Sequence, residues 1–196
     1  MSTAPATHSN PVPSDWLQRW AHLLPAGGRL LDLACGRGRH LRWLAGRGFV
    51  LTGIDIDSVA LAALHDLLAP GAVELIVADL ENKPWPMPGR LFDAVLVSNY
   101  LWRPLWPQVL ASLAPGGLLI YETFAAGHAT VGKPSRPDFL LQAGELLARC
   151  EGLHIVAYED GFLDTPPRFV QRVVALRPGA EAGAPPRHAL QAPAPP

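Results

Sequence analysis

Short apolar runs alternate with amphipathic segments along most of the chain. Runs rich in Leu, Val and Ile, which are typical of strands, are expected at 29–34, 50–54, 73–78, 92–97 and 118–122. Helical patterns are expected at 15–24, 38–45, about 57–68, after residue 101 and at 142–150. This alternation predicts an α/β fold, a doubly wound parallel sheet with helices on both faces.

The last two apolar runs break the alternation. Residues 153–159 and 168–176 both read as strands, and the segment 160–167 between them carries no helical pattern. They are therefore expected to form an antiparallel hairpin. The segment 123–137, which follows the fifth strand, is too long for a simple connector, so it is predicted to be a lid or substrate loop.

Both ends of the chain have a different composition. Residues 1–13 are small and polar, and residues 178–196 are rich in Pro, Ala and Gly. Such segments bury too little apolar surface to fold, so both are predicted to be disordered tails. A single domain is then expected at 14–177.

Charge and cysteine content exclude several classes of function. The formal net charge is −1 and no cluster of Lys and Arg occurs, which makes a nucleic-acid partner unlikely because phosphate binding relies on clustered cations. Cys35 and Cys150 suggest neither a disulfide framework nor a metal site. No secretory signal and no membrane-spanning run is visible. These features predict a cytoplasmic protein without a membrane or metal partner; none points to an oligomeric state.

A glycine-containing loop follows the first strand and is the first candidate for chemistry. The strand carries Asp32, and Cys35-Gly36-Arg37-Gly38 opens the next helix. Glycines let the backbone approach a ligand, and a helix start offers free N–H groups. Asp55 closes the second strand, where a carboxylate can accept both ribose hydroxyls. Leu41 stands where a dinucleotide fingerprint would have its third glycine, which disfavours a nicotinamide cofactor.

Four segments resemble the motifs of class I S-adenosylmethionine-dependent methyltransferases. They occur in the family's order and spacing: Leu30–Gly38, Gly53–Ser58, Ala78-Asp79-Leu80 and Leu113–Ile120. The resemblance implies a Rossmann-like sheet of seven strands, in the order 3-2-1-4-5-7-6, with the last strand antiparallel. Three further segments resemble the tellurite-resistance-type branch of the family, which implies a small-molecule acceptor: Tyr121–Phe124, Pro137–Leu141 and Gly144–Leu147.

The resemblance also implies a set of residues for S-adenosylmethionine. Asp32 and the backbone of Gly36–Gly38 would hold the methionine part, Asp55 the ribose hydroxyls, and Ile56 the adenine face. Asp79 and the Leu80 N–H would bind the edge of the adenine, and the Ser98 carbonyl would accept from the ammonium. The whole expected set is Asp32, Ala34, Cys35, Gly36, Gly38, His40, Asp55, Ile56, Asp79, Leu80 and Ser98.

Acceptor-binding groups are expected beyond the carboxyl ends of strands four and five. The expected substrate residues are Tyr100, Arg103, Glu122, Phe124 and Arg136. The cofactor carries the activated group, so a base is needed only for a protonated acceptor. His128 is the candidate base because its pKa lies near neutrality, with Tyr100 and Asn99 as further catalytic candidates. A solvated histidine and an aromatic wall are the alternative interpretations of His128 and Tyr100.

The sequence thus predicts methyl transfer to a small molecule. Methyl transfer to a nucleic acid or a protein is a second hypothesis, which the low charge disfavours. A non-catalytic S-adenosylmethionine-binding protein is a third, because no fixed catalytic signature is present.

Overall fold

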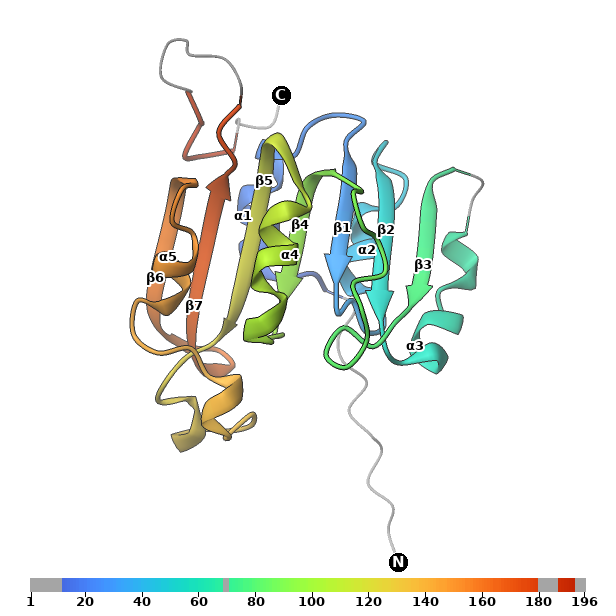
Figure 1. The fold of residues 1–196 in the computed structure, drawn as a ribbon. Helices are drawn as coiled ribbons and strands as arrows, with labels where there is room; N and C mark the ends of the chain where they lie inside the picture. Colours follow the sequence, from blue (N-terminus) through green and yellow to red (C-terminus); the bar gives the residue numbers. More distant parts are fainter. Residues whose placement is uncertain (1–11, 69–70, 180–186, 193–196) are drawn as a thin grey trace, which may run out of the picture.

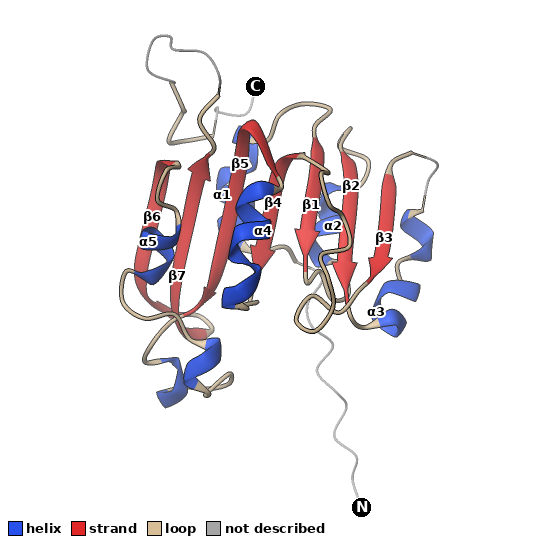
Figure 2. Ribbon diagram, in the orientation of Figure 1, coloured by secondary structure: helices blue, strands red, loops and turns tan. Residues whose placement is uncertain are grey.

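The computed structural model describes residues 12–68, 71–179 and 187–192. A single seven-stranded sheet runs through the molecule, with helices packed on both of its faces (Figures 1 and 2). Its strand order, β3-β2-β1-β4-β5-β7-β6, confirms the sequence prediction. The strands are β1 (Arg29–Leu33), β2 (Val50–Asp55), β3 (Val73–Val77), β4 (Phe92–Ser98), β5 (Leu113–Phe124), β6 (His154–Asp164) and β7 (Pro167–Leu176).

Parallel pairing covers the first five strands, and the hairpin closes the sheet. β1 pairs in parallel with β2 and β4, so the carboxyl ends of these strands meet at one edge. β7 lies antiparallel between β5 and β6. The chain adds β2 and β3 on one side of β1 and β4 and β5 on the other, and this switch leaves a crevice at the carboxyl edge, where ligands bind in open α/β sheets.

The helices divide between the two faces of the sheet. α1 (Asp15–Trp20) and α2 (Arg39–Leu44) bury Trp16, Trp20 and Leu41 on one face, where α3 (Ser58–Ala62) adds Leu61. α4 (Trp106–Ala111) and α5 (Glu145–Arg149) cover the other face (Figure 1). Three-residue 3₁₀ turns occupy Ala21–Leu23, His65–Leu67, Arg103–Leu105, His128–Thr130 and Pro137–Phe139. No helix in the described ranges has the length and apolar character needed to cross a membrane.

Three expected elements differ from the sequence prediction. The helix expected at about 57–68 ends early, because the chain tightens into a 3₁₀ turn that directs Leu64 under Gly38. The turn expected at residues 115–117 lies inside β5, because buried Leu113 already pairs with Phe92 before the register shifts. The hairpin loop expected at 160–167 shrinks to Thr165-Pro166.

The sequence pattern does not reveal the end of the hairpin, because the residues there are exposed and do not alternate between apolar and polar. Phe162 and Phe169 nevertheless face each other there, with ring centroids 4.8 Å apart. The disorder predicted for the two tails falls largely outside the described residues. Within the described part, the backbone oxygen of Ala189 lies 2.9 Å from Nε2 of His22.

A lid, residues 125–141, projects from the carboxyl end of β5. Both of its ends are fixed at the same point: Ala126 donates its N–H to the Leu141 carbonyl and Leu141 donates to the Phe124 carbonyl. Just beyond it, the fully buried side chain of Gln171 accepts from the Leu146 N–H and donates to the Gln142 carbonyl. The lid therefore leaves and rejoins the sheet at defined positions.

Arg103 ties the lid to α5. Its guanidinium makes a two-pronged ion pair with Glu145, at 2.7 and 2.8 Å, and donates to the Asp138 and Leu140 carbonyls. Hydrogen bonding from Arg103, with further support from the Gln142 N–H and Arg149, lowers the pKa of Glu145 to about 2. Since the Glu145 side chain is only 14% exposed, this pairing is shielded from solvent.

We expect the Glu145 pairing to make folding stability depend on pH. A lowered carboxyl pKa stabilises the native state above pH 4.5, the ordinary pKa of Glu, and this contribution is lost as pH falls from 4.5 toward 2. Glu145→Gln should lower the free energy of unfolding at pH 7 by up to roughly 3 kcal/mol. It should also make that free energy less dependent on pH between 4.5 and 2. Urea unfolding at pH 7, 4.5 and 3 measures both effects.

The matched control is Asp138→Asn, which breaks the exposed pair with Arg136. Exposed ion pairs contribute about 0–1 kcal/mol to stability, so the free energy of unfolding of this variant should fall with pH as steeply as that of the wild type. If the stability of Glu145→Gln fell equally steeply at low pH, Glu145 would not be the cause of the pH dependence.

Candidate cofactor and acceptor site

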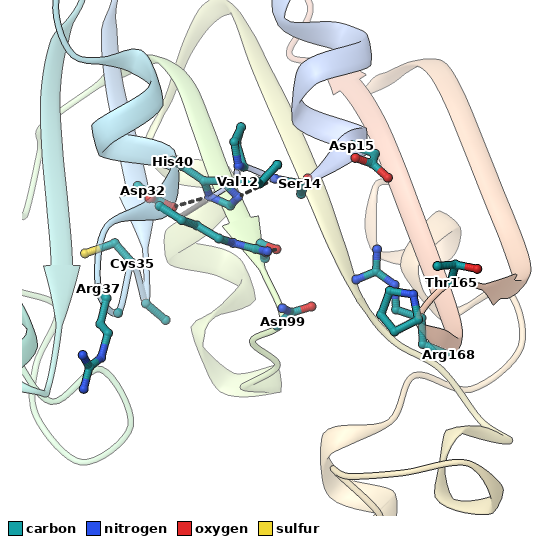
Figure 3. A pocket seen from close by; sticks show the side chains of 16 residues that line it. Val12, Ser14, Asp15, Asp32, Cys35, Arg37, His40, Asn99, Thr165 and Arg168 are labelled. Atoms are coloured by element: carbon teal, nitrogen blue, oxygen red, sulfur yellow. Dashed lines mark hydrogen bonds and ion pairs between the residues drawn. The ribbon is translucent and has the colours of Figure 1, made fainter. Parts of the chain in front are cut away.

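Two cavities adjoin at the carboxyl ends of β1, β2 and β4. The first, of about 520 Å³, lies between the loop after β1, the end of β4, residues 12–15 and the turn of the β6–β7 hairpin (Figure 3). The second, of about 370 Å³, lies between the ends of β2 and β3. Ala34 lines both, so they form one elongated site.

The loop after β1 separates these two cavities and takes an unusual backbone path. Ala34, Gly36 and Gly38 all have positive φ angles, of 52°, 53° and 66°. A side chain at Gly36 would meet no protein atom within 4 Å, whereas one at Gly38 would clash with Leu64 at 2.5 Å. Gly36 therefore leaves open space for a ligand beside the backbone, and Gly38 avoids the strain that a side chain would have at its positive φ.

Asp55, at the end of β2, holds this loop in place. Its Oδ2 accepts a 2.7 Å hydrogen bond from the Gly36 N–H, and its Oδ1 accepts from the Asp57 N–H at 2.9 Å. The sequence predicted only a ligand-binding role. The carboxylate has about four acceptor positions, so these two bonds leave capacity for a ligand in the second cavity, which Asp55 lines.

Asp32 and His40 meet on the wall of the first cavity. Nδ1 of His40 lies 3.4 Å from Oδ1 of Asp32, and both side chains are buried (Figure 3). The other oxygen, Oδ2, is buried without a hydrogen-bond partner among the described residues. An unpartnered buried carboxylate oxygen on a cavity wall suits a cationic or hydrogen-bond-donating ligand group.

Cys35 contributes packing here. Burial, then the charges of Asp32 and Asp55, raises the pKa of its thiol, which stays protonated and is no nucleophile.

The second cavity combines an apolar side chain with carboxylates. Ile56 is 64% exposed and lies on the cavity wall together with Asp79 and Leu80. Hydrogen bonds from the Asn82 side chain, and then from the Asn82 and Glu81 N–H groups, lower the pKa of Asp79. Asp79 therefore shapes its own loop as well as facing the cavity.

A polar relay joins the ends of β4 and β5. Arg39 donates to the Ser98 hydroxyl at 2.7 Å, and that hydroxyl donates to Oε1 of Glu122 at 3.0 Å. Glu122, expected to face the substrate, is buried, and its Oε2 has no partner among the described residues. Ser98 lines the first cavity, and Glu122 lies behind it.

A third cavity, of about 290 Å³, lies between the β4 end and the lid. Its walls are formed by Glu81, Asn99, Tyr100, Leu101, Thr123, Phe124, Pro134 and Phe139. Asn99 also lines the first cavity and Tyr100 the second, so all three cavities adjoin. Of the expected substrate residues, Tyr100 and Phe124 come together here with the catalytic candidate Asn99.

The Tyr100 phenol is placed as a hydrogen-bond donor. Its buried oxygen makes no hydrogen bond of good geometry with the described residues, and the carboxylate of Glu81 is its nearest charged neighbour. Burial, followed by the charges of Glu81 and Asp79, raises the pKa of Tyr100, so the phenol stays protonated at neutral pH.

His128 is buried beneath Phe124, away from the lining of the third cavity. The two rings stack with centroids 4.3 Å apart, and Nε2 lies 3.0 Å from the Lys133 carbonyl. A carbonyl only accepts, so this contact puts the proton on Nε2. The catalytic role expected for His128 stays a prediction, and this geometry favours support of Phe124 and of the lid.

The two arginines expected to clamp the acceptor make other contacts. Arg103 pairs with Glu145 and donates hydrogen bonds to two backbone carbonyls of the lid. Arg136 is exposed on the lid and pairs with Asp138 at 2.8 Å. Neither lines any of these three cavities.

Three arginines line the first cavity and were not expected from the sequence: Arg37, Arg39 and Arg168. Arg39 follows Gly38 and carries the relay to Ser98. Arg168, from the start of β7, lies across the cavity from Asp32 (Figure 3). The spacing after the glycine loop could have indicated Arg39. The position of Arg168 depends on the register of the hairpin, which the sequence pattern does not reveal.

Comparison with known proteins finds a methyltransferase domain in part of the chain. Residues 30–117 match a family model described as "Methyltransferase domain". The chain is 31% identical over 126 residues to a ubiquinone biosynthesis O-methyltransferase of Chromobacterium violaceum, a match that covers 61% of this chain and 53% of the relative. A second relative, the putative methyltransferase YqeM of Bacillus subtilis, is 30% identical over 125 residues, covering 59% of this chain and 50% of that protein. The chain thus spans about half the length of these relatives.

Solved structures share the fold. An S-adenosylmethionine-dependent methyltransferase from Mesorhizobium loti superimposes with a TM-score of 0.64 at 21% identity, covering 81% of this chain and 95% of the other. TehB from Haemophilus influenzae also superimposes with a TM-score of 0.64, at 18% identity, and the match covers 83% of this chain and 61% of TehB. The four motifs, the strand order and these matches make the chain similar to the class I S-adenosylmethionine-dependent methyltransferases.

Proposed function

We propose that this protein transfers a methyl group from S-adenosylmethionine to a small-molecule acceptor. The observation that carries the proposal is the chain of three adjoining cavities, joined at Ala34, Asn99 and Tyr100. Two of them flank the glycine loop and the third lies under the lid. This arrangement suits a long cofactor whose reactive group reaches the acceptor at the β4 end.

The residues present fit the cofactor. Asp55, Ile56 and Asp79 would hold the adenosine part in the second cavity, and the open space at Gly36 would admit the ligand beside the backbone. The unpartnered Oδ2 of Asp32 would receive a cationic or hydrogen-bond-donating group of the methionine part. When bound, the cofactor supplies a methyl group already activated on a sulfonium, so the protein has only to bind, align and exclude water.

Residues at the third cavity would orient the acceptor. Tyr100 offers a neutral O–H donor, and Asn99 has a φ of 56°, which directs the chain sharply away from β4. Phe124 and Phe139 provide apolar walls beneath the lid. We assign acceptor binding to this cavity and assign His128 to the support of Phe124.

A small acceptor suits this site better than a polymer. A cavity of about 290 Å³ approaches the range of small-molecule pockets, whereas nucleic acids need an extended basic groove. The relative named as an O-methyltransferase supports an acceptor with a hydroxyl group. The buried free thiols of Cys35 and Cys150 suit a reducing cytoplasm.

Asp55→Ala should weaken S-adenosylhomocysteine binding at least about tenfold, since it removes a charged acceptor from the ligand and unpins the Gly36 loop. Isothermal titration measures the affinity. The matched control is Asp57→Ala, which removes the cap of α3 and costs about 1 kcal/mol of stability without changing the binding surface. Equal affinity of wild type and Asp55→Ala would contradict the proposed cofactor site.

Tyr100→Phe should lower turnover about tenfold while leaving the S-adenosylhomocysteine affinity within twofold, because only one hydrogen bond to the reacting acceptor is lost. Tyr158→Phe, a change on β6 outside the three cavities, is the control and should leave turnover unchanged. Turnover that is insensitive to Tyr100→Phe would remove Tyr100 from the acceptor site.

The proposed reaction itself is tested by following S-adenosylhomocysteine release with panels of small phenols, thiols and amines, and with RNA, DNA and peptides. We expect release with members of the small-molecule panel. Release only with a polymer would refute the acceptor class. Cofactor binding without turnover on any panel would favour the non-catalytic alternative, and tight NAD binding instead of S-adenosylmethionine would refute the cofactor.

A further inference from the structure

Arg168 differs from most arginines of this protein in its surroundings. Arginines paired with a carboxylate are Arg19, Arg29, Arg39, Arg42, Arg90, Arg103, Arg136, Arg149 and Arg172. Arg47 and Arg177 donate to backbone carbonyls. Within the described ranges, Arg37, Arg168 and Arg187 have neither kind of partner, and the first two line the first cavity.

The hairpin register fixes where Arg168 points. Side chains alternate along a strand, so Arg168 lies on the same face of β7 as Arg172, whose guanidinium packs 4.8 Å from the centre of the Trp16 ring. This is the face covered by α1, next to the first cavity. Arg168 pairs across the hairpin with Leu163, and both strands are antiparallel there, so its backbone is held by the ladder.

The side chain of Arg168 is partly desolvated without compensation. Its Nε is buried and has no hydrogen-bond partner among the described residues. Buried donors of this kind are normally paired with protein, water or ligand, so an unpaired one is unfavourable. The planar guanidinium presents Nε and one terminal nitrogen as a fork that matches the two oxygens of a carboxylate.

Other charged groups facing the cavity leave Arg168 unneutralised. Asp32 is turned to His40 on the opposite wall, and Asp15 forms no ion pair with Arg168. Arg39 is engaged by Ser98 and Glu122, while Arg37 is exposed on the glycine loop. Among the described residues, therefore, no carboxylate pairs with Arg168, although Asp15 and Asp32 line the same cavity.

We propose that Arg168 binds a carboxylate of the methyl acceptor, so that acceptors of this protein are small carboxylic acids. The inference rests on the proposed function, because it takes the cofactor to lie against the glycine loop and Asp32. Arg168 lies on the opposite wall, beside the turn at Thr165-Pro166 (Figure 3). Asn99 lines both this cavity and the third one, so the carboxylate site adjoins the proposed acceptor cavity.

The test is a titration of the protein saturated with S-adenosylhomocysteine. The probes are benzoate, phenylacetate and hexanoate, each compared with its neutral amide by ligand-observed NMR. We expect the wild type to bind at least one acid more tightly than its amide. Arg168→Gln should weaken that acid roughly tenfold or more and leave the amide unchanged, since a charge-assisted hydrogen-bond pair is lost. Arg47→Gln, far from the cavities, should behave as the wild type.

A second arm distinguishes the acceptor's carboxylate from that of the cofactor. S-adenosylhomocysteine and its decarboxylated analogue are titrated into wild type and Arg168→Gln. We expect both affinities to stay within twofold of the wild type. If Arg168→Gln lost affinity for S-adenosylhomocysteine but not for the decarboxylated analogue, Arg168 would bind the carboxylate of the cofactor. That result would overturn the proposal.

Arg168→Lys provides a second variant should Arg168→Gln unfold. It keeps the charge but loses the fork, so it should retain only part of the preference for acids. A preference for acids that is unchanged in Arg168→Lys and Arg168→Gln, or absent from the wild type, would overturn the inference. Failure of the wild type to bind S-adenosylhomocysteine would instead refute the proposed function on which it rests.

Discussion

The hydrogen bond from the Gly36 N–H to Asp55 joins the ends of two neighbouring parallel strands, and the geometry of the site depends on it. At 2.7 Å it fixes a loop whose φ angles at Ala34, Gly36 and Gly38 are all positive. The loop in turn divides the crevice into two cavities with Ala34 between them. One carboxylate thus shapes the binding surface and also contributes to it.

The other walls of the site come from distant parts of the chain. The relay from Arg39 through Ser98 to Glu122 links α2 to β4 and β5, and Arg103 with Glu145 fixes the lid over the third cavity. The β6–β7 hairpin adds Arg168 from the opposite side. Six buried polar side chains lack a hydrogen-bond partner among the described residues, and three of them, Asp32, Tyr100 and Arg168, line the proposed site. The other three, Trp20, Glu122 and His128, do not line its three cavities.

Local patterns in the sequence predicted the buried strands well, because apolar runs leave strong signals, and the resemblance to a known family supplied the strand order. They failed where tertiary contacts decide. Arg103 resembled a substrate clamp until the ion pair with Glu145 appeared, and a loop position suggested exposure for His128, which stacks under Phe124. Arg168 was missed because the exposed hairpin end lacks alternation. Its meeting with Asp32 across one cavity is a long-range property that no local motif records.

Hydrogen exchange with and without S-adenosylhomocysteine tests the account most directly, because it reports on each backbone segment separately. If the cofactor lies along the two cavities that meet at Ala34, added ligand should slow exchange at residues 34–38, 55–57 and 79–82. The hairpin end at residues 163–168 should change little until an acceptor is added. Protection confined to other segments, or none at saturating ligand, would contradict the proposed site.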